Sequence, residues 1–284
     1  MIELHLERKP IDKKEYVKRT ALLSDVSRII KDDCIIYENG QPLIFYAKIK
    51  EDVTNLRWAV KTTKFTNGKR TQGLNSQSRT FGYSPRNALR QDYCYPANIA
   101  LDQPKQTLVI SGFAKTLMTY YEKYFPEKYK EHLDLVEEKV LTDWKIGDTP
   151  FTSGIVNKNN PLKYHYDSGN FKGMLSNMVV LKSDIDGGHL VIPELDLALE
   201  VADQTLTIFN GQDILHGVSQ IDYKNDHAYR YSVVYYSLEQ MWKCQTLGEE
   251  LDRIRKIKTK REEQRLNPEH IESLFKQVKK QTKK

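Results

Sequence analysis

The chain has 284 residues, of which 39% are hydrophobic and 29% are charged, and its formal net charge at pH 7 is +6. This composition excludes a disordered chain and suits one large domain, or one domain with appendages. The charged N-terminal segment and the lack of an apolar run of roughly 18 residues exclude a signal peptide and a membrane span, so we expect a soluble, unsecreted protein.

The cysteines indicate a reducing environment. Cys34, Cys94 and Cys244 are scattered, odd in number and never spaced as Cys-x-x-Cys. They suggest neither a disulfide framework nor a thiolate zinc site. We therefore expect no disulfide-linked partner and an intracellular location, either the cytoplasm of a microbial or virus-infected cell or the nucleus.

Basic residues are concentrated in two segments. Residues 53–91 contain eight basic and no acidic side chains, and residues 249–284 contain twelve basic and seven acidic ones. The remainder of the chain is therefore acidic overall. This segregation favours a polyanionic partner, although a run of like charges can also be plain solvated surface.

The N-terminal half is predicted to mix strands, loops and helices. Asn39-Gly40 supplies a hairpin turn between two β-rich segments of residues 34–49. Residues 61–90 are rich in Gly, Ser, Thr and Asn, which favours a long ordered loop or a mobile arm. Apolar residues recur at helical spacing over residues 108–124, and Pro126 separates this helix from a second one over residues 127–140.

The C-terminal half is predicted to be mainly β. Short apolar segments punctuated by Gly, Asn and Asp give eight strand candidates, at residues 151–156, 163–166, 174–181, 187–193, 197–201, 204–209, 214–218 and 229–236. A charged helix follows from Leu247, stops at Asn267-Pro268, and precedes a second helix over residues 271–278.

These elements predict an α+β chain with a mainly β core. Eight short strands with turns between them indicate a double-stranded β-helix of the jelly-roll or cupin type, flanked by N-terminal helices and a charged helical C-terminal extension. We divide the chain into a support region at 1–150 with the basic loop 53–91, a catalytic core at 151–246, and an extension at 247–284, which together form one catalytic unit.

A metal-binding pattern lies within the predicted core. His165-x-Asp167 ends one strand candidate, and His216 follows 49 residues after Asp167. Two imidazoles and one carboxylate on one face form the ligand set of non-haem iron(II) oxygenases, which leaves other positions open for O₂ and a co-substrate. An isolated His-x-Asp is more often a pair of surface polar residues, so its weight depends on its surroundings.

An arginine on the last strand strengthens the pattern. Alternation along residues 229–236 places Arg230, Ser232, Val234 and Tyr236 on one face. A buried arginine needs an anion, and the distal carboxylate of a dicarboxylate co-substrate would supply one, with Ser232 adding a hydrogen bond. The alternative is a structural salt bridge to Asp196 or Glu200.

The order His-x-Asp, Gly-Gly-x-Leu-x-x-Pro, His-Gly-Val and Arg-x-Ser resembles the Fe(II)/2-oxoglutarate dioxygenase superfamily across residues 151–238. Within it, two motifs look like the TET/JBP branch, which oxidises the 5-methyl group of pyrimidines in DNA. They are His165-Tyr-Asp-Ser-Gly-Asn170 and Arg230-Tyr-Ser-Val-Val-Tyr-Tyr236, and residues 71–94 also look like the JBP-type upstream region.

The resemblance implies roles for individual residues. Asn170 would hydrogen-bond a flipped base and Tyr236 would line the pocket. His189, the first residue after the glycine pair, is the candidate for the co-substrate's 1-carboxylate, with an outward-facing strand histidine as the alternative. The chain departs from vertebrate TET enzymes in lacking their cysteine-rich region and long insert, and in having Leu238 where they place a base-contacting histidine. It looks more like compact microbial or viral members.

The resemblance implies a dioxygenase that uses Fe(II), 2-oxoglutarate and O₂ to hydroxylate 5-methylcytosine or thymine in double-stranded DNA after base flipping. Candidate contacts to the DNA backbone are Lys69, Arg70, Arg79, Arg86 and Arg90. Two alternatives remain open. One is a 2-oxoglutarate-dependent hydroxylase of a protein side chain or a small molecule, and the other is an inactive barrel that binds nucleic acid.

Overall fold

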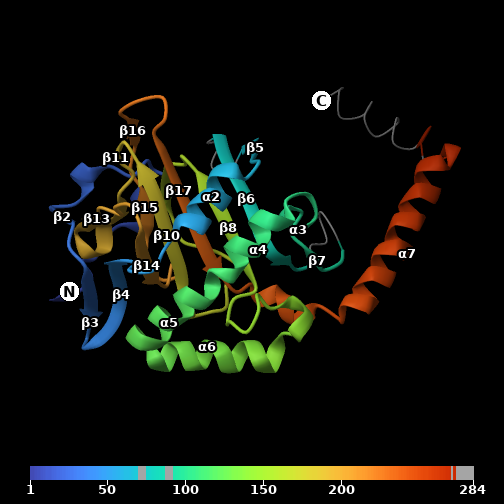
Figure 1. Cartoon of the computed structure of the whole chain (residues 1–284), viewed down its shortest axis with the longest axis horizontal. Coiled ribbons are helices and arrows are strands. Elements are labelled where there is room, and N and C mark those ends of the chain that lie inside the picture. The colour runs from blue at the N-terminus through green and yellow to red at the C-terminus, as the bar shows by residue number, and fades with distance from the viewer. Residues whose placement is uncertain (70–74, 87–91, 270, 273–284) are drawn as a thin grey trace.

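The computed structural model describes residues 1–69, 75–86, 92–269 and 271–272. Two β-sheets pack face to face, and helices cover the outer face of the larger one (Figure 1). The described helices are α1 (Lys13–Tyr16), α2 (Thr54–Thr62), α3 (Ile99–Asp102), α4 (Pro104–Gly112), α5 (Ala114–Tyr124), α6 (Pro126–Lys139) and α7 (Leu247–Leu266). No helix among the described residues is both long and apolar enough to cross a lipid bilayer.

The larger sheet has ten strands in the described part of the chain. Its order is β1 (Ile2–His5), β3 (Cys34–Glu38), β4 (Gln41–Lys48), β14 (Thr205–Phe209), β10 (Ser176–Ser183), β17 (Tyr229–Tyr236), β8 (Ser153–Lys158), β6 (Asn75–Ser84) and β5 (Thr66–Lys69), with β7 (Tyr95–Pro96) paired to β6. The hairpin between β3 and β4 turns at Asn39 and Gly40, whose φ angles of 50° and 76° are those of the expected two-residue turn.

The smaller sheet carries the strands that flank the metal pattern. Its order is β2 (Arg28–Ile30), β13 (Leu197–Leu199), β12 (Leu190–Ile192), β15 (His216–Val218) and β9 (Leu162–His165). A separate pair joins β11 (Ile185–Gly187) to β16 (Ile221–Tyr223). All eight predicted strands are therefore confirmed, and the α+β class with a jelly-roll-like core is confirmed with them.

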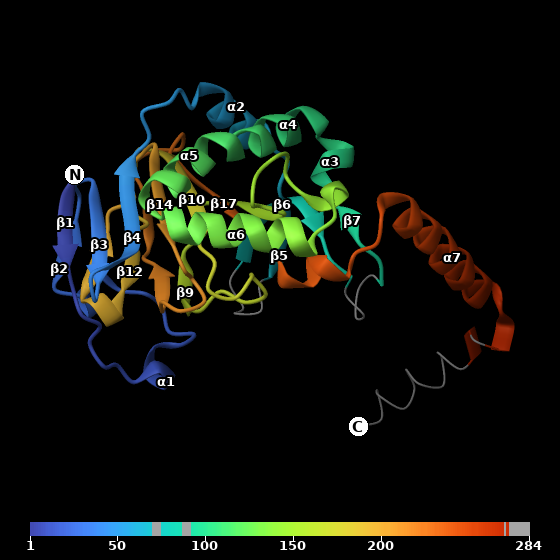
Figure 2. The ribbon, with the colours of Figure 1, turned by 90° about the horizontal axis from the view of Figure 1, so that it is seen from below.

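Two apolar layers hold this arrangement together. Between the sheets, Ile44 of β4 and Val180 of β10 pack against Leu190 and Leu197 of the smaller sheet. On the outer face of the larger sheet, alternate residues such as Val233 pack against α2, α4 and α5, which Figure 2 shows gathered on that side. Burying one side chain of this kind contributes about 1.5–3 kcal/mol.

The prediction of a long loop or mobile arm at residues 61–90 is wrong. It contains the end of α2 and the β5–β6 hairpin, and β6 pairs with β8 in the larger sheet. The strand is polar, and pairing with a neighbouring strand, rather than composition, decides its structure. Phe81 is its buried anchor, and its ring fills the space left by the missing side chain of Gly154.

The helices follow the predicted spacing with one difference. The first predicted helix is divided into α4 and α5 at Phe113, and Pro126 occupies the first turn of α6, where its missing N–H costs nothing. Helix α7 begins at a capping box formed by Thr246 and Glu249 and ends at Asn267, as expected. Most of the second C-terminal helix that we predicted lies outside the described residues.

The expectation that the cysteines stay unpaired is also wrong. Cys94 and Cys244, separated by 150 positions, form a disulfide, and Cys34 is free and buried. Sequence spacing gives no signal for this pair, because packing around Trp144 and Met241 brings the two residues together. The cysteines therefore do not support a reducing compartment.

Candidate active site

A cavity of about 360 Å³ opens between the two sheets. It is lined by side chains of β8, β9, β10, β15 and β17 and by the segment that follows β9. His165, Asp167, His216, Arg230 and Asn170 all contribute to its wall, so residues predicted from distant motifs lie around one space.

The two histidines and the aspartate converge at one side of this cavity. Strands β9 and β15 pair antiparallel with His165 opposite His216, and their ring centroids are 4.4 Å apart. Asp167 Oδ1 lies 3.7 Å from His165 Nε2 and 4.0 Å from His216 Nε2. All three ligand atoms lie within 4.8 Å of one another, which is close enough to hold one metal ion.

Hydrogen bonds fix which nitrogen of each ring faces this space. His165 Nδ1 lies 2.8 Å from the carbonyl oxygen of Lys163, and His216 Nδ1 lies 2.9 Å from that of Ile214. A carbonyl oxygen only accepts, so Nδ1 must donate and carry the proton. In the neutral ring this leaves the Nε2 lone pair directed toward Asp167, which is the form that binds a metal.

Two neighbours that sequence reasoning did not assign hold this cluster in place. A Cβ added at Gly211 would lie 2.2 Å from Asp167 Oδ2, so only glycine leaves room for that carboxylate. Glu194, which is 3% exposed, accepts hydrogen bonds from the Tyr166 hydroxyl at 3.2 Å and from the Leu215 amide at 3.1 Å. Its carboxylate thus joins the two segments that carry the histidines.

Arg230 occupies a different part of the same wall. The residue is 2% exposed, and its Nε and Nη2 atoms have no hydrogen-bond partner among the described residues. Burial lowers its pKa to about 10, which still leaves the guanidinium charged at neutral pH. A Cβ at Gly188 would lie 2.8 Å from Arg230 Cδ, so this glycine provides the space for the side chain. A buried cation without a partner is costly, so the cavity wall holds an uncompensated positive charge at Arg230.

The alternative of a structural salt bridge is not supported. Asp196 instead pairs with Lys9 at 2.6 Å and accepts hydrogen bonds from Ser27. No carboxylate in the described part of the chain forms an ion pair with Arg230, Glu200 included.

The predicted alternation along β17 is confirmed. Arg230, Ser232, Val234 and Tyr236 line the cavity, whereas Tyr231, Val233 and Tyr235 pack beneath the helices. Asn157 of β8, which sequence reasoning missed, lies beside Ser232 and donates to its hydroxyl at 3.2 Å. The sequence gives little signal for it, because its 6% exposure and its pairing with Ser232 become visible only in the structure.

Asn170 and Tyr236 line the other end of the cavity. Asn170 is 8% exposed, donates to the Ser176 hydroxyl at 3.2 Å, and forms a β-bridge with Leu238, which is also in the cavity wall. Along β17, Arg230 and Tyr236 are six residues apart, or roughly 20 Å. The cavity therefore has one end lined by Arg230 and a separate end bordered by Asn170.

His189 does not line the cavity; its neighbour Leu190 does. The two preceding glycines both have positive φ angles, 72° at Gly187 and 67° at Gly188, so regular alternation starts only after them. Burial and the nearby Lys182 lower the pKa of His189. The ring is half-buried, and its Nδ1 atom is enclosed with no hydrogen-bond partner among the described residues, so a role at the 1-carboxylate stays a prediction.

The basic residues proposed to contact DNA are partly engaged elsewhere. Arg79 pairs with Asp102, and Arg86 pairs with the fully buried carboxylate of Glu250. The side chain of Lys69 and all of Arg70 and Arg90 lie outside the described residues. Two basic residues of segment 53–91, which has no acidic residue of its own, thus pair with carboxylates from other parts of the chain.

A family model, Tet_JBP, described as the oxygenase domain of the 2OGFeDO superfamily, matches residues 93–239. The chain belongs to the Tet_JBP family. Membership implies Fe(II), 2-oxoglutarate and O₂ as the cofactor and co-substrates, and the cluster of His165, Asp167 and His216 offers a possible metal site for them.

Curated relatives and a solved structure extend the comparison of this Tet_JBP oxygenase domain. Proteins named bifunctional helicase and thymine dioxygenase JBP2 are similar to it: that of Leishmania braziliensis is 24% identical over 123 residues, and that of Trypanosoma brucei brucei 26% over 129. These matches cover 43% and 45% of this chain but only 11% and 12% of the relatives, so the chain corresponds to a small part of each.

The fold of this Tet_JBP member is shared with NgTET1, solved in complex with 5mC DNA. The TM-score is 0.59 at 13% sequence identity, over 84% of this chain and 88% of that one. At 13% identity, this likeness shows that the two proteins share a fold.

Proposed function

We propose that this protein is an Fe(II)- and 2-oxoglutarate-dependent dioxygenase that hydroxylates the 5-methyl group of a pyrimidine base, 5-methylcytosine or thymine, in double-stranded DNA. The observation that carries the proposal is the buried, unpartnered Arg230 in the same cavity as the His165, Asp167 and His216 cluster. The matched relatives named thymine dioxygenase, and the structural neighbour solved with 5mC DNA, support the choice of substrate.

The residues present fit the cofactor and co-substrate. His165, Asp167 and His216 would hold the iron, since their ligand atoms lie within 4.8 Å of one another and Nδ1 of each histidine is fixed by a backbone carbonyl. Arg230 would bind the distal carboxylate of 2-oxoglutarate through a charge-assisted fork, with Ser232 and Asn157 beside it. When bound, these groups with O₂ supply the oxidative chemistry that hydroxylates a C–H bond.

The protein's own part is to position the base and to exclude water. A methyl group inside a duplex cannot reach a cavity between two sheets, so the nucleotide must be flipped out at a cost of a few kcal/mol. Asn170 would hydrogen-bond the edge of the base, and Tyr236 would shape the pocket beside it. Leu238, at the same end, offers only apolar contact. The β-bridge between Asn170 and Leu238 holds the two sides of this end together.

Incubation of duplex DNA containing 5-methylcytosine or thymine with the protein, Fe(II), 2-oxoglutarate and ascorbate tests the proposal. The digested nucleosides are then analysed by mass spectrometry. We expect a hydroxymethyl nucleoside that depends on 2-oxoglutarate. Succinate formation that is indifferent to DNA would instead indicate a protein or small-molecule substrate. DNA binding with neither product would indicate a binding module.

A further inference from the structure

Helix α7 projects away from the body of the protein, as both views show (Figures 1 and 2). Its 20 residues correspond to a length of about 30 Å. Every residue from 258 to 269 is exposed, and beyond Arg253 no hydrogen bond or ion pair joins the helix to the body in the part of the chain that the structure describes. Packing therefore does not explain the outer part of this helix.

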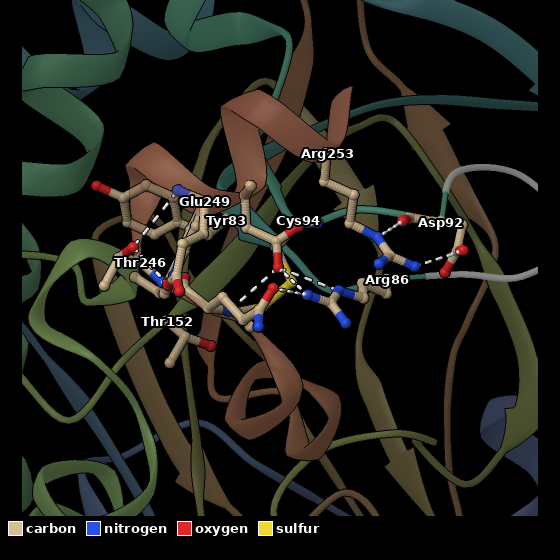
Figure 3. The surroundings of a disulfide bond; sticks show 12 residues. Tyr83, Arg86, Asp92, Cys94, Thr152, Thr246, Glu249 and Arg253 are labelled. Carbon is tan, nitrogen blue, oxygen red and sulfur yellow. Dashed lines mark hydrogen bonds and ion pairs between the residues drawn. A yellow bond between two sulfur atoms is a disulfide. The ribbon is translucent and has the colours of Figure 1, made fainter. Parts of the chain in front are cut away.

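The base of α7, in contrast, is firmly attached (Figure 3). The Cys94–Cys244 disulfide lies just before it. Glu250, which is fully buried, accepts hydrogen bonds from Arg86 Nε at 3.0 Å, from the Cys94 amide at 2.9 Å and from the Gln245 amide at 3.0 Å. Burial alone would raise the pKa of Glu250, but these bonds lower it, so the carboxylate is charged at neutral pH.

The same anchor is continuous with the rim of the cavity. Leu238 lines the cavity, and the 3₁₀ helix Glu239–Lys243 follows it directly. Within that helix, Trp242 stacks on Phe171 with ring centroids 5.6 Å apart, next to Asn170. The direction of α7 is therefore fixed relative to the end of the cavity where the base would enter.

Positive charge is concentrated where α7 leaves the body. Residues 253–261 contain six basic and no acidic side chains. Arg253 pairs with Asp92 at 2.6 Å (Figure 3), and Arg255 pairs with Asp252 at 3.0 Å. The other four have no ion pair among the described residues; they are Lys256, Lys258, Lys260 and Arg261.

These four cations point in different directions. At 3.6 residues per turn, positions 256, 258, 260 and 261 cover an arc of about 200° around the helix axis. A helix that binds a membrane surface needs an apolar face, and the remaining arc is polar, since Asp252, Thr259, Glu262 and Glu263 lie on it. A helix of about 10–12 Å diameter with cations over more than half of its circumference instead matches the major groove of B-form DNA, about 12 Å wide and bordered by phosphates on both sides.

We propose that residues 253–261 form a basic arm that lies in the major groove of duplex DNA on one side of the target base. This inference rests on the proposed function, because it takes the DNA that enters the cavity as the arm's ligand. The nine residues of the arm span about 14 Å, which is less than half a turn of duplex. Because α7 projects from one side of the protein, the arm would require flanking duplex on one side only.

The test compares DNA binding by the full-length protein and by a variant with Lys256→Gln, Lys258→Gln, Lys260→Gln and Arg261→Gln. Glutamine keeps helix propensity and removes charge. Affinity for a 30-base-pair duplex is measured against salt, without iron or 2-oxoglutarate. Each phosphate contact contributes about 0.9 to the slope of log affinity against log salt, so we expect the slope to fall by about 3 to 4. Trimming the duplex on the arm's side should abolish the difference between the two proteins.

A control variant removes the same charge elsewhere, through Lys105→Gln, Lys123→Gln, Lys128→Gln and Lys130→Gln on the helices that cover the larger sheet. It should retain the full slope. A variant with Lys256→Arg, Lys258→Arg and Lys260→Arg should bind like the original protein, and circular dichroism checks that α7 remains helical in every variant. An unchanged slope in the glutamine variant, an equal loss in the control, or stronger arm-dependent binding to anionic vesicles would overturn the proposal.

Failure of the arm and failure of the proposed function give different results. Hydroxymethyl product together with an unchanged salt slope in the glutamine variant would contradict the arm and support the activity. Arm-dependent duplex binding without any oxidised nucleoside would support the arm and contradict the activity. Double-stranded RNA has a narrow major groove, so equal arm-dependent binding to RNA would also contradict the placement in the groove.

Discussion

His165 and His216 face each other across the β9–β15 pair, with ring centroids 4.4 Å apart and Nδ1 of each ring held by a backbone carbonyl two residues earlier. Each ring is thus held in place by the chain segment that carries it. Asp167 completes the cluster from the segment after β9, where its amide donates to the Gly211 carbonyl at 2.8 Å. A site prepared in this way loses little conformational entropy when it takes up an ion.

Asp167→Ala should abolish turnover and weaken metal binding by at least about 100-fold, because it removes the only carboxylate of the cluster. DNA retention should survive, since the arm and the cavity rim are untouched. Mn(II) titration followed by electron paramagnetic resonance measures the first effect, and a gel-shift assay the second. Asp186→Asn, at an exposed carboxylate that pairs with Lys224, is the control. Full activity in Asp167→Ala would reject the metal assignment.

Gly211→Ala should reduce metal affinity by about 10- to 100-fold without unfolding the protein. The new Cβ would lie 2.2 Å from Asp167 Oδ2 and 3.2 Å from His216 Cε1, so the carboxylate must move. Gly112→Ala is the matched control, because a Cβ there meets no atom within 4 Å. Equal metal affinities in the two variants would show that Asp167 does not need its present position.

Arg230→Met should have opposite effects on stability and on co-substrate binding. Without 2-oxoglutarate, removing a buried, unpartnered cation should raise the free energy of unfolding by about 1–4 kcal/mol. With 2-oxoglutarate, the variant should lose the ligand-induced rise in Tm, because its affinity falls by at least about 100-fold. Thermal melts with and without the co-substrate measure both effects. A variant that 2-oxoglutarate stabilises as much as the original protein would disprove the assigned role.

His132 should make the protein sensitive to acid. It is fully buried in α6, 2.9 Å from the Ser237 hydroxyl, and burial lowers its pKa from 6.5 to about 3. Between these values the unfolded chain binds a proton that the folded protein does not, so stability falls as pH falls, by up to about 1.4 kcal/mol per pH unit. His132→Gln should lower stability at pH 7 but flatten this dependence between pH 6.5 and 4.5 in urea unfolding. An equally steep dependence in the variant would assign the acid sensitivity to other groups.

Local pattern predicted the strands and the residues of the cluster. The eight core strands alternate or run apolar between turn residues, which is a signal within each segment, and the motif around His165 and the strand from Arg230 lie on such strands. Features made by distant contacts were not predictable. The polar strand β6 depends on pairing with β8, and the Cys94–Cys244 disulfide depends on packing around Trp144.

The site shows the same division between local and distant information. The place of Arg230 in the cavity wall was predictable from the alternation along its strand, whereas Glu194 acts through Tyr166 and Leu215, which reach it from two other segments of the chain. The orientation of His189 depended on the two glycines before it. Their positive φ angles reset the alternation, and sequence alone does not give the face on which it restarts.

The pairing of β4 with β14 and of β6 with β8 means that segment 151–246 is not an autonomous folding unit. Both strands that flank its part of the larger sheet come from earlier in the chain. A fragment cut at residue 150 would present two unprotected hydrogen-bonding edges and the bare apolar surface that α2, α4 and α5 cover. Such a fragment would aggregate, so the N-terminal region is part of the scaffold that makes the cavity.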